Sequence, residues 1–369
     1  MEIALNQKQL KKALRAIRTL VPRNPSQPFQ SYALVECVEG TDNSMRIVYE
    51  RPGVTLSMRL DCNSSGPCRF LLPVRHLPAK FAYSAVDVVY GESCDIVKFI
   101  SPTETIAFDV FKPEGYSYSN VESGDCSACV YLKSGDLLDI LKHTMFAAKQ
   151  RATMERYVLN CVCIEFSDGQ ATAVATDRYR LAAKSVAIAS GQGEHQAVIP
   201  TDIVRSVIQA LDRTGKVCIK FAEDVLFLST DRVTIRITNG GYTYPKWRVV
   251  FPEDLPEHRV VTNAAGLLKA VKEAAINAKH KDHSGTVFTF TNGRLLLKTE
   301  CPQVGNGAAE IDVQYEGTEF SRKLNPRFVV EFLDRVSQET VEILVWGERK
   351  PLLFRAGKGY EYLVMPMFK

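Results

Sequence analysis

The chain has 369 residues, of which 46% are hydrophobic and 24% charged, and 46 basic residues against 42 acidic ones leave a net charge of +4. These values are ordinary for a globular protein with two or three domains of about 100–150 residues, and the small positive excess does not by itself predict nucleic-acid binding. The sequence contains neither the roughly 20-residue apolar run that spans a bilayer nor a signal peptide, so we expect a cytoplasmic protein without a membrane partner.

A strand followed by an amphipathic helix is predicted three times along the chain. In each copy an apolar run leads into a segment whose apolar residues recur at helical spacing. Leu10, Leu137 and Leu267 occupy the same place in the three copies, which gives offsets of 127 and 130 residues. The copies cover residues 3–17, 129–142 and 259–272.

A second landmark repeats with nearly the same period. Strands that end at or near Pro73, Pro200 and Pro326 each open another predicted helix, and proline suits the first turn of a helix because its missing N–H would be unpaired there. These prolines are 127 and 126 residues apart, and Gly-Tyr-Ser-Tyr at 115–118 is matched by Gly-Tyr-Thr-Tyr at 241–244. The shared period predicts three repeats; the alternative is a chance alternation of strands and helices in an α+β protein.

Between the helices, apolar and polar residues alternate over short segments such as 45–49, 54–60, 233–237 and 295–299. Alternation bounded by turn residues is typical of antiparallel strands. We therefore predict an α+β fold of three repeated domains, each with two helices on antiparallel sheets. The predicted domains are 1–126, 127–255 and 256–369.

The positive charge is concentrated on the predicted helices. In the first helix Leu10, Leu14, Ile17 and Val21 form an apolar stripe, and no acidic residue lies among residues 7–21. A basic face without a recognisable base-reading motif favours contact with DNA phosphates, which does not depend on base sequence; a solvated face with no partner is the alternative. The basic residues on predicted helices that we assign to DNA are Lys8, Lys12, Arg15 and Lys272.

Motifs of enzyme sites are absent from the sequence, which has no glycine-rich phosphate loop, no paired histidines of the zinc-protease type and no serine elbow. The ten cysteines are scattered, and this pattern favours buried free thiols over a metal site. Asp177 lies in a turn signal, so we expect it to cap a turn. We predict no cofactor, no metal and no catalytic activity; a hydrolase that uses the cysteines or His280 and His283 is the alternative.

Two motifs carry a resemblance to a known family. Arg-Tyr-Val-Leu-Asn at 156–160 precedes Val-Ala-Thr-Asp-Arg-Tyr-Arg-Leu-Ala at 174–182, and Tyr-Leu-Val-Met-Pro-Met stands at 362–367. Together they resemble signatures of the bacterial DNA polymerase III beta subunit (beta sliding clamp) family, at similar spacing over the whole chain. The resemblance implies a head-to-tail homodimer that closes into a ring around double-stranded DNA and makes a polymerase processive. The implied partners are that DNA, the DNA polymerase catalytic subunit, the clamp loader and other proteins with a clamp-binding motif.

The resemblance also implies three sets of functional residues. The first set would line a hydrophobic pocket for short, extended, apolar peptides of the partners: Leu159, Thr176, Arg178, Tyr179, Arg180, Leu181, Pro245, Val250, Leu363, Met365, Pro366 and Met367. The second set would contact duplex DNA in addition to the helical residues above: Arg23, Asn24, Lys149, Gln150 and Arg151. The third set, Phe108 and Ile276, would lie in the dimer interface, and both residues would equally suit ordinary core positions.

Four residues near this pocket depart from the family pattern. Arg178 and Tyr179 replace the usual Gly-His pair, and Val249 and Phe368 stand where the family has arginines. These departures put bulk and a charge at the pocket rim, so we expect a narrowed or re-specified pocket in a divergent clamp. The alternative is a clamp-fold peptide-binding hub, an accessory or inhibitor-insensitive variant that does not itself close on DNA.

Overall fold

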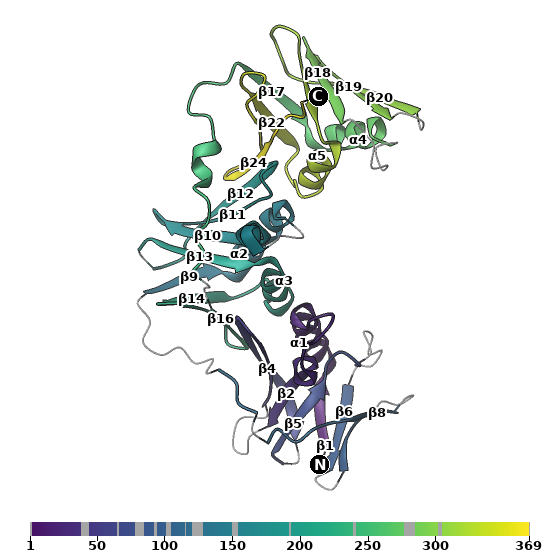
Figure 1. Ribbon diagram of the computed structural model, residues 1–369, viewed down its shortest axis with the longest axis vertical. Helices are drawn as coiled ribbons and strands as arrows, with labels where there is room; N and C mark the ends of the chain where they lie inside the picture. The colour runs from purple at the N-terminus through teal and green to yellow at the C-terminus, as the bar shows by residue number, and fades with distance from the viewer. Residues whose placement is uncertain are drawn as a thin grey trace. The chain divides into compact units, whose positions relative to one another are not determined.

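The computed structural model describes residues 2–37, 44–64, 66–77, 85–91, 94–100, 105–114, 116–119, 128–149, 154–191, 193–238, 241–276, 285–301 and 305–368. The chain divides into two compact units, whose elements carry the labels of Figure 1. Unit 1 comprises Met1–Asp139, Glu165–Gln170 and Ala187–Tyr242. Unit 2 comprises Ile140–Ile164, Ala171–Val186 and Thr243–Lys369.

Unit 1 contains a large antiparallel sheet and two helices. The strands along the longest path of the sheet are, in order, β8 (Thr105–Asp109), β7 (Cys94–Ile100), β6 (Ala85–Gly91), β1 (Glu2–Asn6), β4 (Val54–Ser64), β16 (Val233–Thr238), β15 (Val225–Ser229), β14 (Lys216–Ala222) and β9 (Ala128–Lys133). A branch from β4 adds β3 (Ser44–Arg51), β2 (Tyr32–Cys37) and β5 (Cys68–Pro73). The remaining elements are α1 (Gln7–Leu20), η1 (Pro28–Ser31), β13 (His195–Pro200) and α3 (Thr201–Ala210).

Helix α1 forms where the sequence supplies both a cap and an apolar stripe. The Asn6 side chain accepts hydrogen bonds from the backbone N–H groups of Lys8 and Gln9, at 3.0 and 3.4 Å, which satisfies two of the unpaired donors at the start of the helix. Leu10, Leu14 and Ile17 of the predicted stripe are buried, whereas Val21 is half-buried and follows the last residue of the helix. The helix packs on α3, whose Ser206 hydroxyl donates to the carbonyl of Ala16 at 3.0 Å.

Unit 2 contains two antiparallel sheets and two helices. The larger sheet runs through β10 (Cys161–Ser167), β11 (Gln170–Thr176), β12 (Arg180–Ala187), β24 (Tyr360–Val364), β23 (Leu352–Arg355), β22 (Thr340–Val345) and β17 (His258–Asn263). The smaller sheet has the order β20 (Gly305–Asp312), β19 (Arg294–Cys301), β18 (Thr286–Thr291) and β21 (Phe320–Leu324). The helices are α4 (Ala264–Ala274) and α5 (Pro326–Leu333), with the short η2 (Met145–Ala147), η3 (Met154–Asn160) and η4 (Trp247–Val250).

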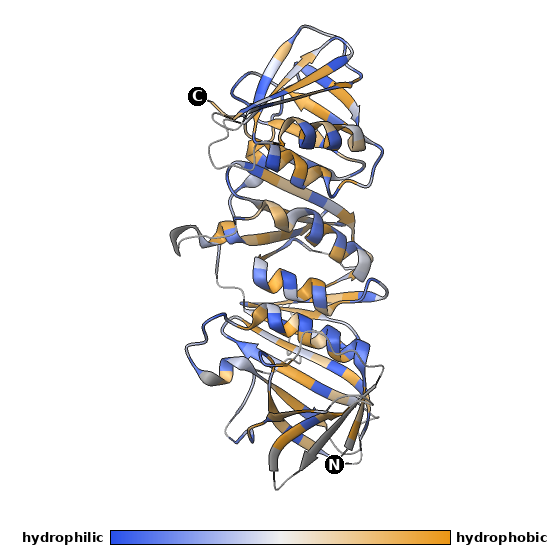
Figure 2. Cartoon of the chain, turned by 90° about the vertical axis from the view of Figure 1, so that its right-hand side faces the viewer, coloured by the Kyte–Doolittle hydropathy of each residue, from blue (hydrophilic) through white to orange (hydrophobic). Residues whose placement is uncertain are grey.

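Hydrophobic and hydrophilic residues alternate along many strands, as Figure 2 shows and as the sequence predicts. In β18 every second residue is buried, beginning with Thr286. The aromatic rings of Phe288 and Phe290 are fully buried on that face, so the period-two pattern places the core on one side of the smaller sheet.

The large sheet of unit 1 and the larger sheet of unit 2 each pass through two of the predicted repeats. In unit 1, β4 of the first repeat pairs with β16 of the second, with Met58 opposite Val233. In unit 2, β12 of the second repeat pairs with β24 of the third, with Leu181 opposite Leu363. This continuity of backbone hydrogen bonding explains why the chain divides into two units although the sequence has three repeats. The predicted domain boundaries near residues 126 and 255 remain a prediction.

The α+β class is confirmed, and the helices follow the predicted landmarks in the second and third repeats. The second repeat has α2 (Ser134–Thr144) and α3, and the third has α4 and α5. In the first repeat, the backbone N–H of His76 bonds to the Pro73 carbonyl at 3.2 Å in a turn, so the helix predicted directly after Pro73 does not begin there, and residues 78–84 are not described. Among the helices that the structure describes, none is long and apolar enough to cross a membrane.

Candidate functional site

A tight turn between β11 and β12 organises the site. The Thr176 hydroxyl donates to the Arg180 carbonyl at 2.6 Å and accepts from the Arg178 N–H at 3.1 Å. The Asp177 carboxylate accepts from the N–H groups of Tyr179 and Arg180, at 3.0 and 3.1 Å. Asp177 therefore caps the turn as predicted, through the side-chain-to-backbone bonding that makes aspartate common in turns.

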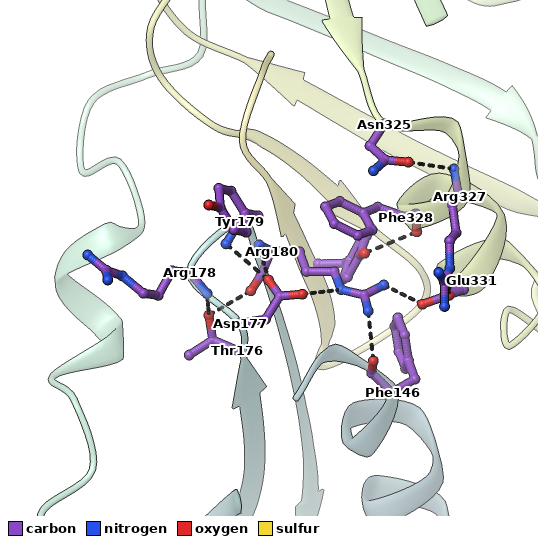
Figure 3. Close-up of polar contacts among 11 residues, drawn as sticks. Phe146, Thr176, Asp177, Arg178, Tyr179, Arg180, Asn325, Arg327, Phe328 and Glu331 are labelled. Atoms are coloured by element: carbon purple, nitrogen blue, oxygen red, sulfur yellow. Dashed lines mark hydrogen bonds and ion pairs between the residues drawn. The ribbon is translucent and has the colours of Figure 1, made fainter. Parts of the chain in front are cut away.

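Arg180 connects this turn to helix α5, because its side chain lies between Asp177 of the turn and Glu331 of the helix (Figure 3). Its buried guanidinium pairs with Asp177 at 3.0 Å and with Glu331, and it donates to the Phe146 carbonyl at 3.0 Å. The ring of Phe328 packs against the guanidinium, with 4.3 Å from its carbon to the ring centroid. All these residues belong to unit 2, so the turn is held rigidly within that unit.

The electrostatics of this cluster keep Glu331 ionised. Burial alone would raise the pKa of the Glu331 carboxyl, but hydrogen bonds from Arg180 and Arg327 outweigh burial and hold the pKa below its usual value. Arg327, one turn earlier on α5, pairs with Glu331 at 2.6 Å. Asp177 and Glu331 together neutralise Arg180, so the Arg180 side chain adds little net positive charge to the surface of this region.

Residues of this turn line an open, mostly apolar cavity of about 450 Å³. Leu159, Leu181 and Leu363 are buried in its wall, whereas Tyr179 is 67% exposed at its rim. The N–H of Met365 donates to the Tyr179 carbonyl at 2.9 Å, which ties the segment after β24 to the turn. The lining residues are Val158, Leu159, Thr176, Arg178, Tyr179, Arg180, Leu181, Pro245, Lys246, Trp247, Val250, Pro351, Leu363 and Met365, all in unit 2.

The structure brings together every predicted pocket residue except Pro366 and Met367. Pro366 is buried but is not part of the lining. The N–H of Met367 donates to the Lys323 carbonyl at 2.7 Å, and its sulfur lies 2.7 Å from where a Cβ on Gly285 would be, so this side chain packs against unit 2 elsewhere. The alternating direction of an extended segment explains Pro366, which points away from the face that Leu363 and Met365 share. Met367 leaves this face because its backbone bonds to Lys323.

Four lining residues were not predicted: Val158, Lys246, Trp247 and Pro351. Val158 and Lys246 are direct neighbours of predicted residues, so their signal was available in the sequence. Of the four family departures, Arg178 and Tyr179 line the cavity, but Val249 and Phe368 do not, and they are 77% and 60% exposed. The cavity volume lies within the roughly 300–1,000 Å³ range of ligand pockets, so the departures leave it open.

The residues predicted to contact DNA differ in their surroundings. Lys8, Arg15, Arg23 and Asn24 are exposed, and Lys149 is half-buried. Lys12 pairs with Asp212 at 2.5 Å and Lys272 pairs with Asp334 at 2.8 Å, so these two cations already have carboxylate partners. Gln150 and Arg151 lie outside the described residues.

The two predicted interface residues lie near sheet edges. Phe108 is on β8, the last strand of the unit 1 sheet, and its half-buried ring meets Phe99 edge-on at 5.8 Å. Ile276 follows α4 and is 64% exposed. Helix α4 packs against β20, which is the last strand of the smaller sheet in unit 2.

The described part of the chain contains no assembled site for the alternative hydrolase that would use cysteines or histidines. The eight cysteines whose side chains are described are free and buried or half-buried, and Cys161 and Cys163 are fully buried as predicted. No group of three or more His, Cys, Asp and Glu side chains is placed to hold a metal among these residues. His280 and His283 lie outside them.

Comparisons with known proteins agree with this geometry. A family model of the DNA polymerase III beta subunit, central domain, matches residues 131–245, and the model of its C-terminal domain matches residues 248–368. The beta sliding clamp of Chlamydia pneumoniae is 23% identical over 381 residues, covering 100% of this chain and 99% of the relative. That of Pseudomonas putida is 24% identical over 371 residues, covering 100% of both.

Solved structures show the same fold. The DNA polymerase III beta subunit of Thermotoga maritima gives a TM-score of 0.86 at 19% identity, covering 100% of this chain and 99% of that one. The sliding clamp of Pseudomonas aeruginosa bound to griselimycin gives 0.84 at 22% identity, covering 100% of both chains. The chain therefore has the sliding clamp fold. With two family models that together match more than half of it, the chain belongs to the DNA polymerase III beta subunit family.

Proposed function

We propose that this protein is a sliding clamp that encircles double-stranded DNA as a homodimeric ring and tethers the replicative polymerase, the clamp loader and other partners through its apolar cavity. The observation that carries the proposal is the cavity itself, because an apolar wall with an adaptable Met365 at its rim suits short segments from several partners. The role is a non-catalytic one, performed in the cytoplasm where a bacterial-type replisome works.

Two free sheet edges support the closing of a ring. Among the strands that the structure describes, β8 is at one end of the unit 1 sheet and β20 is at one end of the smaller sheet in unit 2, so each has a side without a strand partner. An edge of one protomer can pair with the other edge of its partner, head to tail, and two such contacts close a dimer. We propose Phe108 and Ile276 as the apolar contacts beside these edges, and 1–126, 127–255 and 256–369 as the three domains.

The charge pattern suits a ring that slides. The exposed residues Lys8, Arg15, Arg23 and Asn24 offer a few phosphate contacts, and two further cations are already paired within the chain. Weak, uniform contacts hold no fixed position on the duplex, whereas a closed ring retains DNA by topology.

The pocket can be tested with two neighbouring residues. We would measure, by fluorescence anisotropy, binding of a labelled octapeptide with leucine or phenylalanine at alternate positions and asparagine between them. Val250→Asp puts a charge into the apolar lining and should weaken binding at least about tenfold. Val249→Asp puts the same charge on the adjacent exposed residue outside the cavity and should change little. Equal effects of the two variants would contradict the assignment of the cavity.

The ring can be tested by its topology. Dilute protein would be mixed with nicked circular DNA, concentrated and separated from free protein by gel filtration in high salt. We expect protein to stay with the circles in high salt and to be released when a restriction enzyme linearises them. Retention on linear DNA, or loss from circles as salt rises, would indicate ordinary surface binding and contradict encirclement.

The second candidate function is a clamp-fold hub that binds peptides without closing on DNA. The observation in its favour is that every lining residue of the cavity lies within unit 2, so peptide binding requires no ring. A protein that binds the octapeptide through Val250 but remains a monomer at all concentrations would be this hub.

A further inference from the structure

The charge around the cavity has one sign. The described residues that line it include Arg178, Arg180 and Lys246 and no aspartate or glutamate. Arg180 is neutralised by its ion pairs with Asp177 and Glu331. The side chains of Arg178 and Lys246 are exposed, and neither forms an ion pair within the part of the chain that the structure describes. An apolar cavity therefore carries two uncompensated cations at its rim.

Arg178 is held in place by an unusual backbone. Its φ of +82° lies in the left-handed region, which glycine adopts readily and a side chain with a Cβ adopts at a cost. Its N–H is fixed by the Thr176 hydroxyl, and the capped turn leaves the backbone no freedom to relieve this conformation. Figure 3 shows the Arg178 side chain pointing away from the Arg180 cluster, so no carboxylate of that cluster satisfies it.

Lys246 comes from a different element. It immediately precedes η4 and contributes to the lining beside Pro245 and Trp247. Two cations from separate segments, the β11–β12 turn and the chain before η4, thus converge on one apolar cavity within unit 2. Unpaired charge of one sign beside a binding cavity favours a partner segment of the opposite charge.

We propose that the partner segment that enters this cavity carries an acidic side chain beside its apolar residues, and that Arg178 and Lys246 recognise that carboxylate. The inference rests on the proposed peptide-binding function and specifies the chemistry of the partner. Apolar side chains fill the wall of leucines, and the carboxylate accepts hydrogen bonds from the guanidinium, whose planar fork matches it in shape. The same cations repel a partner with lysine or arginine at that place, so they both select and exclude.

Three octapeptides test the proposal. All share leucine or phenylalanine at alternate positions, which places the apolar side chains on one face of an extended strand. The intervening positions are aspartate in the first, asparagine in the second and lysine in the third. In low salt we expect the aspartate peptide to bind the wild-type protein about tenfold more tightly than the asparagine peptide, with the lysine peptide weakest. Raising the salt concentration should narrow these differences by screening.

Variants assign the effect to the two residues. Arg178→Gln and Lys246→Gln should each reduce the ratio of affinities for the aspartate and asparagine peptides about threefold. Lys358→Gln removes an exposed cation of the same unit that is not part of the lining, and it should leave the preference intact. Circular dichroism spectra would verify that the variants fold. We expect them to fold because all three substituted residues are exposed.

The outcomes separate this inference from the proposed function. Equal affinity of wild-type protein for the aspartate and asparagine peptides, with both sensitive to Val250→Asp, would overturn acidic recognition while peptide docking stands. Failure of all three peptides to bind would count against the proposed peptide function itself. A preference that persists in both glutamine variants would show that the selectivity arises elsewhere and would also overturn the inference.

Discussion

The buried guanidinium of Arg180 joins β12 to α5, and its loss should be among the more costly single changes in unit 2. Arg180→Ala leaves the Asp177 and Glu331 carboxylates without their shared cation, and removing one partner of a buried pair costs about 3 kcal/mol. Urea unfolding followed by tryptophan fluorescence measures this directly, because both tryptophans of the chain are buried in unit 2. Arg259→Ala is the control, since it breaks an exposed pair with Glu342 and should cost less than about 1 kcal/mol. Similar costs for the two variants would contradict the role given to Arg180.

The same cluster predicts sensitivity to acid. The pKa of Glu331 is lower in the folded chain than its ordinary value of 4.5, so the unfolded state binds more protons in acid. Its stabilising contribution is therefore complete above pH 4.5 and is lost as the pH falls through the folded pKa. We expect Glu331→Gln to be less stable than wild type at neutral pH, with a difference that shrinks on acidification below pH 4.5. Urea unfolding midpoints measured over this range would show it; a difference that stays constant with pH would be inconsistent with an ionised Glu331.

Single residues also show how far the sequence could predict the site. The motif around the β11–β12 turn located most of the lining, because the residues that build the turn are contiguous. The pairing of Lys12 with Asp212 could not be predicted from an unbroken basic stripe in the first helix, because the acid comes from the end of another helix far along the chain. Pro351 was missed because it lies outside the recognised motifs and reaches the cavity only through the pairing of β22, β23 and β24.

At the scale of elements, local pattern predicted strands and helices better than their grouping. Local pattern placed α1, α2 and α4 through the helical spacing of their apolar residues, and α3 and α5 through the proline landmark. It could not predict that β12 pairs with β24, since both strands are apolar and many partners would satisfy them. The proline landmark held at Pro326, the first residue of α5, but not directly after Pro73, where a turn follows.

The contact between α4 and β20 depends on a glycine. A Cβ added to Gly307 would lie 2.1 Å from the carbonyl oxygen of Ala274, at the end of α4, and neither backbone can yield easily. Gly307→Ala should therefore push β20 away from the helix and destabilise unit 2 by about 1–3 kcal/mol. Ala308→Ser, at the exposed neighbouring position, should change stability by less than about 0.5 kcal/mol. Urea unfolding of the two variants would decide, and a Gly307→Ala protein as stable as wild type would show that β20 packs less closely than described.

At the scale of the whole molecule, β8 of one protomer is expected to pair with β20 of its partner. Sheets left open at β8 and β20 invite pairing, and proteins usually protect such edges unless an assembly covers them. Ile276, 64% exposed beside one of these edges, has no evident role in the isolated chain but would be covered in a head-to-tail dimer. A dimer would thus explain both features at once.

Small-angle scattering and light scattering at several concentrations should give a hollow particle of twice 41.2 kDa, about 82 kDa, for the wild type. Ile276→Asp places a charge in the proposed contact and should raise the dimer dissociation constant at least about tenfold, whereas Val249→Asp, an equally exposed change away from the edges, should not. The Ile276→Asp protein should lose retention on circular DNA but keep its affinity for the octapeptides, because the cavity lies wholly in unit 2. If the wild type instead remains at 41.2 kDa at every concentration, ring closure by this chain alone is excluded, and peptide affinity in that monomer would favour the hub.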